Sequence, residues 1–300
     1  MNAAADTNGA DGGDYVALLG TKGGPAIRPG SAMPISNLLR LDGRRIVVDC
    51  GLGVSRGLID HGMALQDLSL ILITHLHSDH YMELGPLLHT AWTTGLNTPV
   101  TVYGPAGLDV YWHHFVESMR ADIELRQSDE GRPALESLVE IRTLDAGTVI
   151  DADGLRVDAM RNAHPPLVDT FALSFRGRRS HVVFSGDTAP LDALADWAAG
   201  CDLLIHEAML EAALPALFAR VGNGDDRLRK HWLRSHTVAS EAARLATRAG
   251  AKSLALNHLI PSDDPDYTQA HWREAAEPHF AGALHVGHDG QVVRWENVDP

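Results

Sequence analysis

Short apolar runs alternate with amphipathic stretches along the chain from residue 15 onward. Runs rich in Val, Ile and Leu, such as "RIVVDC" at 45–50, predict β-strands, whereas apolar residues at helical spacing predict helices. The segments "DADG" at 151–154 and "RGRRS" at 176–180 are typical of hairpin turns. Strands are therefore expected at 15–20, 45–50, 68–74, 100–104, 139–144, 155–161, 170–175, 181–186, 202–207 and 253–259, and helices at 86–95, 107–120, 191–199, 237–249 and 267–277.

The helix expected at 237–249 carries the clearest signals. Thr237 can cap its first turn, and Gly250 suits its C-terminal end. One of its faces is apolar and consists of Val238, Ala242, Leu245 and Ala249. Strands mixed with helices predict an α/β (α+β) fold, with two sheets or one large mixed sheet covered by helices.

No long linker or internal repeat divides the chain. Its 300 residues with 45% hydrophobic content can bury a full core, so we expect a single domain over 14–300. The segment 1–13 is expected to be a disordered N-terminal tail. A helical insertion is expected around 107–138, where it could form a lid or the contact of a homodimer.

The chain is acidic, with a formal net charge of −14. This balance argues against a broad basic surface for nucleic acid or anionic lipid. No apolar run approaches the length of a membrane span, and residues 1–13 lack the features of a signal peptide. Cys50 and Cys201 are too few for a disulfide framework. We therefore expect a cytoplasmic protein without a membrane or nucleic-acid partner.

Histidine is the informative residue type, because 17 of 300 is a high count and histidine is the commonest metal ligand. In "THLHSDH" at 74–80, His75 and His77 are two positions apart. At the end of a strand both side chains then point the same way and can share one metal. Asp79 and His80 follow after the chain has turned, which places them better for a second ion.

Three further polar residues, His164, Asp187 and His258, stand just beyond apolar strands. Because the carboxyl ends of strands gather at the sites of α/β sheets, these residues could complete the ligands of two metals. Imidazole and carboxylate ligands without thiolate suit Zn²⁺, with Mn²⁺ or Fe²⁺ as alternatives. Two ions about 3.5–4 Å apart would bring the pKa of a bridging water toward about 7. The resulting hydroxide would be a nucleophile that Asp79 could orient.

The ordered set His-x-His-x-Asp-His, a later His, a later Asp and a final His resembles that of the metallo-β-lactamase superfamily. The likeness spans Leu18 to Pro261 and implies an αβ/βα sandwich, in which two mixed β-sheets lie between outer helices. It also implies that Asp187 bridges two metals and that Asp49 in "VVDCG" supports the ligands. The other ligands would be His75, His77 and His164 for one metal, and Asp79, His80 and His258 for the other.

Within the superfamily the sequence resembles the tRNase Z and arylsulfatase-like branch. This resemblance implies that Glu207 and His236 work in proton transfer, whereas His206 is expected to be structural. A carboxylate paired with an imidazole raises the pKa of that imidazole and keeps a proton available for a leaving oxygen. The matching motifs are "LLGTKGGP" near the start, "SGDT" at 185–188, "HEA" at 206–208, "SHT" at 235–237 and "LNH" at 256–258.

Two features argue against tRNA as the substrate. Enzymes of the tRNase Z type grip tRNA with a long basic arm, commonly between the later His and the bridging Asp, but His164 and Asp187 are too close in sequence for one. The negative net charge of the chain also opposes binding of a polynucleotide. A basic run at 220–236 is either a solvated face or an anion-attracting lid, with Trp232 available to stack on an aryl or base group.

The sequence therefore predicts a dinuclear zinc hydrolase that uses a metal-bridging hydroxide. Its expected substrates are small anionic esters, either phosphodiesters or aryl sulfate esters. A tRNA 3′-end endonuclease is the alternative within the branch. Hydrolysis of a lactone or β-lactam ring is a further alternative, because it needs the same nucleophile.

Overall fold

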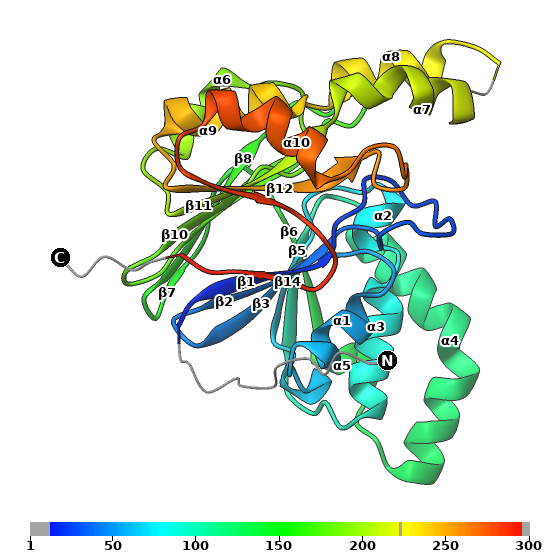
Figure 1. Ribbon diagram of the computed structural model, residues 1–300. Helices are drawn as coiled ribbons and strands as arrows, with labels where there is room; N and C mark the ends of the chain where they lie inside the picture. Colours follow the sequence, from blue (N-terminus) through cyan, green and yellow to red (C-terminus); the bar gives the residue numbers. More distant parts are fainter. Residues whose placement is uncertain (1–12, 222–223, 296–300) are drawn as a thin grey trace, which may run out of the picture.

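Two seven-stranded β-sheets face each other in the computed structural model, which describes residues 13–221 and 224–295 (Figure 1). The first sheet contains β1 (Tyr15–Gly20), β2 (Ser36–Leu41), β3 (Arg44–Cys50), β4 (Leu70–Leu72), β5 (Val100–Gly104), β6 (Val139–Thr143) and β14 (Gln291–Val293). The second contains β7 (Gly147–Ala152), β8 (Leu155–Arg161), β9 (Phe171–Arg176), β10 (His181–Phe184), β11 (Leu203–Met209), β12 (Ser253–Ile260) and β13 (Ala283–Val286). The strand orders are β14-β1-β2-β3-β4-β5-β6 and β13-β12-β11-β10-β9-β8-β7.

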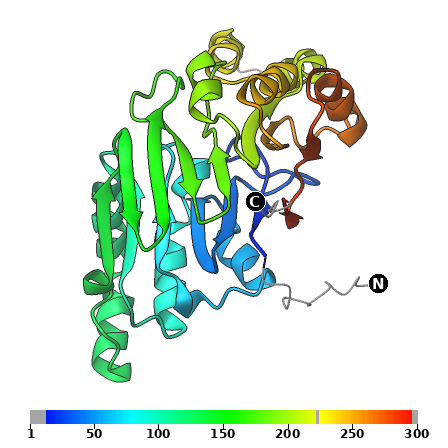
Figure 2. The ribbon, with the colours of Figure 1, turned by 90° about the vertical axis from the view of Figure 1, so that its left-hand side faces the viewer.

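Helices cover the outer faces of both sheets, which gives the predicted αβ/βα sandwich (Figures 1 and 2). The first sheet is covered by α1 (Val54–Asp60), α3 (Leu84–Thr93), α4 (Leu108–Glu130) and α5 (Leu135–Leu138). The second is covered by α6 (Asp192–Trp197), α9 (Ala239–Ala249) and α10 (Gln269–Ala276). The short α2 (Ser78–Tyr81) follows β4, and α7 (Leu214–Val221) lies beside α8 (Arg227–Ser235). Single turns of 3₁₀-helix lie at Leu65–Asp67, Glu211–Ala213 and Glu277–His279.

β1 illustrates how the sequence builds these layers. It is apolar almost throughout, which suits a strand that is buried on both faces. Val16 and Leu18 point into the core between the two sheets, whereas Ala17 and Leu19 point toward the helices on the outer face. Burial of one leucine stabilises a fold by about 1.5–3 kcal/mol. Alternate residues of a single strand therefore hold three layers together.

Parallel strands bring the polar strand ends of both sheets to one edge. In the first sheet β3, β4, β5 and β6 run parallel, and in the second β10, β11, β12 and β13 do so. Residues that follow β4 and β10 meet the end of β12 there, next to α7 and α8. The candidate site lies at this edge, as the positions of the polar strand ends predict.

All ten strands and five helices expected from the sequence are present, and both predicted hairpin turns are confirmed. The apolar pattern does not predict β2, β7, β13, β14, α1, α2, α7 or α8, because most of these elements are short or strongly polar. The prediction that Thr237 caps this helix is wrong. Val238 is the N-cap residue of α9, and the hydroxyl of Thr237 instead donates to the carbonyl oxygen of Thr188 at 2.7 Å. Gly250 ends the helix as predicted, with a φ of 62°.

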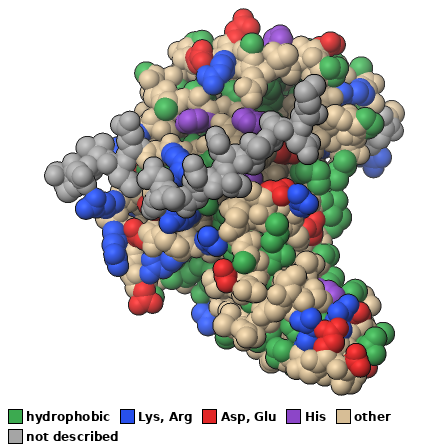
Figure 3. All heavy atoms as spheres, turned by 60° about the horizontal axis from the view of Figure 1, so that its bottom comes forward, with side chains coloured by type: hydrophobic (Ala, Val, Ile, Leu, Met, Phe, Trp, Pro, Cys, Tyr) green, Lys and Arg blue, Asp and Glu red, His purple; other side chains and the backbone are tan. Residues whose placement is uncertain are grey.

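The insertion expected at 107–138 consists mainly of α4 and α5. α4 packs against α3 and β6, and neither helix lines the candidate pocket, so the insertion is not a lid over it. Oppositely charged side chains lie together on the lobe of α4 (Figure 3), in agreement with the ion pair between Arg126 and Asp122. Among the described residues no helix has the length and apolar character needed to cross a membrane. Of the tail predicted at 1–13, only Gly13 lies within the described residues.

Candidate metal centre and active-site pocket

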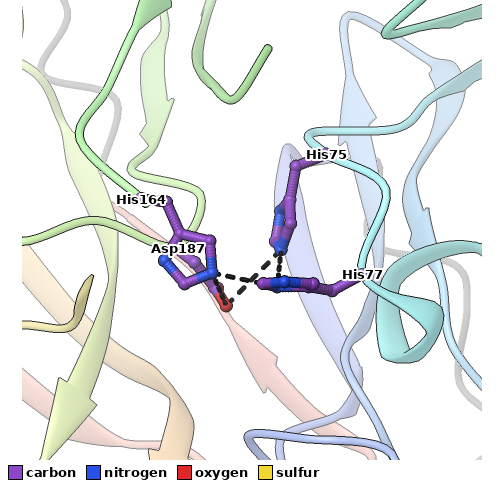
Figure 4. A group of neighbouring side chains, drawn as sticks. All are labelled: His75, His77, His164 and Asp187. Atoms are coloured by element: carbon purple, nitrogen blue, oxygen red, sulfur yellow. Dashed lines mark hydrogen bonds and ion pairs between the residues drawn. The ribbon is translucent and has the colours of Figure 1, made fainter. Parts of the chain in front are cut away.

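Four side chains from three segments converge in the first candidate metal group (Figure 4). His75 and His77 follow β4, His164 follows β8, and Asp187 follows β10. Nε2 of His75 lies 3.1 Å from Nδ1 of His77, which lies 2.9 Å from Nε2 of His164. Oδ2 of Asp187 lies 3.7 Å from Nε2 of His75 and 3.8 Å from Nε2 of His164. Ligand atoms about 2 Å from one tetrahedral ion have similar spacings, since they lie roughly 3.3 Å apart.

A second group consists of Asp79, His80 and His258, and Asp187 lies beside it as well. Oδ2 of Asp187 lies 3.4 Å from Nε2 of His80 and 3.1 Å from Nε2 of His258. Nε2 of His258 is in turn 3.3 Å from Oδ2 of Asp79. The buried Nε2 of His80 has no hydrogen-bond partner among the described residues, which fits a metal ligand. The structure thus brings together all seven predicted ligands, with Asp187 between the two groups.

Burial keeps the histidines of the first group neutral. The pKa of His75 is held well below its usual value by burial and by the nearby His80. Burial also lowers the pKa of His164 to about 4. Only a neutral imidazole can donate a lone pair to a metal, so these rings are in the binding form at neutral pH.

The carboxylate between the groups is ionised although it is buried. Burial alone would raise the pKa of Asp187, but His258 and His80 hold it well below the usual range. Conversely, Asp187 and Asp49 raise the pKa of His80 well above its usual value in spite of burial. A metal cation bound at Nε2 of His80 would replace the proton on that atom, so metal binding is expected to release this proton while the Nδ1–H stays on Asp49.

Asp49, at the end of β3, holds His80 in place as predicted. Its Oδ2 accepts a hydrogen bond from Nδ1 of His80 at 2.8 Å, and its Oδ1 accepts one from the backbone N–H of Thr74 at 2.8 Å. With Nδ1 as the donor, Nε2 of His80 is left to face Asp187. Asp49 has a φ of 62°, a left-handed conformation that non-glycine residues rarely adopt. Surrounding contacts must fix such a conformation at the end of a buried strand, and strained residues of this kind cluster at active sites.

Segments from outside the two groups reach the ligands through backbone atoms. Nδ1 of His164 donates to the carbonyl oxygen of Ser235, at the end of α8, at 2.8 Å. The backbone N–H of Gly24 donates to Oδ2 of Asp79 at 2.8 Å. A Cβ atom on the adjacent Gly23 would collide with the side chain of Ile260 and would lie 3.0 Å from the ring of His258, so this close approach favours glycine.

Glu207 and His236 form a buried ion pair beside the second group. Nδ1 of His236 donates to Oε1 of Glu207 at 2.9 Å, and the same oxygen accepts the backbone N–H of Thr188 at 2.9 Å. Burial opposes a charge on His236, but Glu207 outweighs it and raises the pKa of His236 to about 9. The ring stacks on that of His258, with centroids 5.6 Å apart. A protonated imidazole therefore lies next to the candidate metal group at neutral pH. His206 belongs to neither group.

A pocket of about 400 Å³ lies next to these ligands. One wall is the loop at residues 21–34, here called the N-terminal loop, which contributes Lys22 and Arg28. The other is the helical wall, formed by α7 and α8. Its lining residues are Leu217, Val221, Leu228, His231 and Trp232. The floor includes His77, Asp79, Asp187, His236 and His258.

Most charges of the basic run ahead of His236 face solvent. Arg227 and Lys230 pair with neighbouring aspartates on the exposed side of α8 and do not line the pocket. Arg220 is different, because it pairs with the buried Asp263 at 3.0 Å. Of the two interpretations of this run, the solvated face therefore describes most of it, whereas Trp232 does line the pocket.

Lys22, Asp263 and His231 line the pocket although the sequence does not single them out. The ring of His231 lies 6.1 Å from that of His77, between centroids. In the sequence His231 is marked only by its position five residues before His236. That position indicates a role in the pocket only when α8 is known to be a helix. Lys22 stands in the "LLGTKGGP" motif, but the motif alone assigns it no role.

Comparison with known proteins identifies the family. A sequence model of the family described as anti-Pycsar protein Apyc1 matches residues 18–250. Ribonuclease Z of Mycobacterium bovis is 31% identical to the chain over 277 residues, which cover 91% of this chain and 95% of that protein. The chain belongs to the Apyc1 and ribonuclease Z family.

Solved structures similar to this member of the Apyc1 and ribonuclease Z family agree on the fold. The metallo-β-lactamase fold protein YhfI from Bacillus subtilis matches with a TM-score of 0.67 and 22% identity, over 93% of this chain and 98% of that one. The short form of human tRNase Z matches with a TM-score of 0.66 and 21% identity, over 94% and 99%. The chain is therefore a metal-dependent hydrolase of the metallo-β-lactamase superfamily, similar to tRNase Z, as the sequence predicts.

Proposed function

We propose that the protein is a dinuclear zinc phosphodiesterase that cleaves small anionic phosphodiesters. The position of Asp187 carries this proposal, because one carboxylate oxygen faces both ligand groups and so suits two ions rather than one. Ligands that combine imidazole and carboxylate without thiolate suit Zn²⁺. One ion would be held by His75, His77 and His164 and the other by Asp79, His80 and His258, with Asp187 between them.

When bound, two zinc ions would lower the pKa of a water toward neutrality and draw charge from the ester oxygens. The residues of the chain would position that reaction and move its protons. Asp79, held by the N–H of Gly24, can orient the attacking water and accept its proton. Protonated His236 can donate the proton on Nε2 to the leaving oxygen, while Glu207 holds the ring at Nδ1 and favours its charged form.

The pocket supports a small substrate. Its volume of about 400 Å³ falls within the range of small-molecule sites, which is about 300–1,000 Å³. The helical wall is largely apolar, and Trp232 offers a ring against which an aryl or base group can pack. Relatives of the chain carry the name ribonuclease Z, and cleavage of RNA breaks a phosphodiester bond. This favours phosphodiesters over aryl sulfates, lactones and β-lactams.

A tRNA 3′-end endonuclease is the second candidate, because the 31% identity to ribonuclease Z of Mycobacterium bovis extends over 91% of the chain. Two observations weigh against it. Residues 165–186 contain only a loop and the β9–β10 hairpin, which leaves no room for a long arm between His164 and Asp187. The net charge of −14 also opposes a polynucleotide, whose affinity depends on neutralised phosphates.

Metal analysis and a panel of substrates test the proposal. We expect two zinc ions per chain and turnover of bis(p-nitrophenyl) phosphate that exceeds turnover of p-nitrophenyl sulfate, a lactone and a β-lactam. Cleavage of precursor tRNA at submicromolar enzyme would favour the endonuclease instead. A single metal per chain, or iron with oxygen reduction, would contradict the proposal.

A further inference from the structure

Lys22 is a buried cation in the wall of the pocket. The residue is 4% exposed and belongs to the pocket lining. Its Nζ donates one hydrogen bond, to the carbonyl oxygen of Gly23 at 3.2 Å, and forms no ion pair within 4.0 Å among the described residues. An ammonium group has three N–H donors. Two of these donors therefore have no acceptor in the part of the chain that the structure describes.

The carboxylate of Asp263 acts on Lys22 electrostatically but is held by two arginines. Its Oδ2 accepts a hydrogen bond from Arg28 at 3.1 Å, and its Oδ1 accepts one from Arg220 at 3.0 Å. The side chain of Asp263 is only 3% exposed, so the carboxylate of this ion cluster is largely shielded from water. Three cations thus share one buried carboxylate, and Lys22 is the one without a direct bond to it.

A cation in this position disfavours the folded protein unless an anion joins it. Burial, together with the nearby Arg28 and Arg220, lowers the pKa of Lys22 by more than Asp263 and Asp79 raise it. Buried charges are usually paired, because removal of an unpaired ion from water costs free energy. Lys22 faces a pocket rather than the core. The missing partner can therefore come from the ligand of that pocket.

The backbone places Lys22 at the border of the second ligand group. Gly23, the next residue, packs on the ring of His258, and Gly24 donates its N–H to Asp79. The N–H of Lys22 donates to the carbonyl oxygen of Met33 at 2.9 Å, which closes the base of the loop. An ester held at the candidate metal groups would lie beside this segment.

We propose that the ammonium group of Lys22 is the anion-recognition group of the pocket, which binds an anionic oxygen of an organic phosphate and selects anionic esters over neutral ones. The identity of the ester rests on the proposed function. The existence of an anion site does not, because it follows from the burial of Lys22, its unused donors and the prior engagement of Asp263.

The test compares Lys22→Met with Lys230→Met. Methionine retains much of the side-chain length without the charge, and Lys230 is an exposed lysine of α8 outside the pocket lining. With bis(p-nitrophenyl) phosphate, a monoanion, Lys22→Met is expected to raise KM about tenfold with little change in kcat. With neutral p-nitrophenyl acetate, kcat/KM should equal that of the parent. Lys230→Met should match the parent with both esters.

Calorimetric titration with inorganic phosphate gives a readout that does not need turnover. We expect the Kd for phosphate to be about tenfold higher in Lys22→Met than in the parent or Lys230→Met. The melting temperature should stay unchanged or rise, because an unpaired buried charge is removed. Should it fall, Lys22→Gln replaces Lys22→Met in both assays with the same expected outcomes.

Two results would overturn the role of Lys22: equal losses with anionic and neutral esters, or an unchanged affinity for phosphate. The proposed function can fail separately. If the parent does not turn over bis(p-nitrophenyl) phosphate but the substitution still weakens phosphate binding, the anion site stands and the phosphodiesterase proposal falls.

Discussion

The two walls of the pocket are attached to the fold by different forces. The N-terminal loop is held by hydrogen bonds of its backbone. The carboxylate of Asp289 accepts the N–H of Thr21 at 3.0 Å and the N–H of Met33 at 2.7 Å, one near each end of the loop. Between them, Gly24 donates to the candidate metal ligand Asp79. This wall is therefore joined directly to the floor.

The helical wall rests mainly on apolar contacts. Phe218 and Trp232 stack with centroids 5.6 Å apart, and both pack on a small cluster of buried side chains. Within α8 only Ser235, at the C-terminal end, is buried, and its carbonyl oxygen accepts the hydrogen bond from His164 at 2.8 Å. The rest of the helix contacts the fold along one side. The cluster consists of Met209, Leu214, Leu217 and Ile260.

This contrast separates two roles. A wall that donates hydrogen bonds to a metal ligand can affect the chemistry, because small displacements of a ligand alter catalysis. A wall of apolar side chains affects which substrate fits and how tightly it binds. Substitutions that break the backbone hydrogen bonds of the N-terminal loop are therefore expected to change kcat. Substitutions of side chains that face the substrate, namely Lys22 and those of the helical wall, are expected to change KM.

The largest effect is expected at the floor, to which both walls attach. Asp187→Ala should lose much of its bound zinc and reduce kcat/KM by about 10³-fold or more, since both candidate ions share this carboxylate. Zinc analysis together with assays on bis(p-nitrophenyl) phosphate measures both effects. Asp196→Ala, at an exposed position of α6, is the matched control. A variant with its full zinc content would refute the bridging position.

His236 is the exception that would break a strict division between the walls, because it caps the C-terminus of α8 and yet belongs to the proposed chemistry. His236→Ala should retain zinc but lower kcat about 10²- to 10³-fold for esters with poor leaving groups. Esters of p-nitrophenol, a good leaving group, should be affected much less. Full activity with an alkyl ester would remove His236 from the mechanism, and His114→Ala, at an exposed position of α4, serves as the control.

Asp289→Ala tests the attachment of the N-terminal loop. Loss of its hydrogen bonds to Thr21 and Met33 should loosen the contact of Gly24 with Asp79. We expect kcat to fall about tenfold, since each bond to a charged acceptor contributes about 1.5–3 kcal/mol at most. Steady-state kinetics distinguishes this from a change in KM alone, which would contradict the contrast between the walls. Asp129→Ala, exposed on α4, is the control.

Trp232→Ala tests the helical wall. Removal of the ring should raise KM for aryl phosphodiesters by up to about tenfold, because an aromatic contact contributes about 0.5–1.5 kcal/mol. The value of kcat and the zinc content should stay close to those of the parent. Leu233→Ala changes a neighbouring side chain that is 50% exposed, and its KM should not change. A fall in kcat without a rise in KM would give this wall a role in the chemistry.

The smallest effect concerns the stability of the metal-free protein at alkaline pH. Glu207 raises the pKa of His236 from an ordinary value of 6.5 to about 9 in spite of burial. Its stabilising contribution is therefore complete below pH 6.5 and is lost as the pH rises through about 9. We expect the difference in melting temperature between the parent and His236→Ala to shrink from pH 6 to pH 10. His80 is present in both proteins, so its titration does not contribute to the difference in melting temperature. A difference that stays constant from pH 6 to pH 10 would contradict the raised pKa of His236.

The floor of the site is largely predictable from the sequence, because its residues stand at strand ends. Apolar strands are easy to recognise, and four candidate ligands from His75 to His80 lie within one short motif. What the pattern misjudges is the length of β4, which ends at Leu72. His75 and His77 therefore stand in the loop after the strand, yet both still reach the same group because the loop remains extended at His77, where ψ is 142°.

The walls are much less predictable, since their structure depends on distant contacts. The segment of α8, "RLRKHWLRS", is mostly charged, and only three of its side chains face the pocket. Its stacking partner Phe218 lies on another helix. Likewise, the path of the N-terminal loop depends on Asp289, which lies 268 residues beyond Thr21. A window of neighbouring residues carries no signal of such pairs, so the burial of Lys22 emerges only from the fold.

Asp263 is a contact that the two walls share. Arg28 from the N-terminal loop and Arg220 from α7 grip the same carboxylate. An insertion or deletion in either wall that withdrew its arginine would leave the other arginine with an altered partner. Among relatives of this chain, the lengths of the two walls are therefore expected to change together. A comparison of the lengths of the N-terminal loop and of the helical wall in those relatives would test this expectation. It would also show which pocket shapes keep the N-terminal loop in contact with the floor.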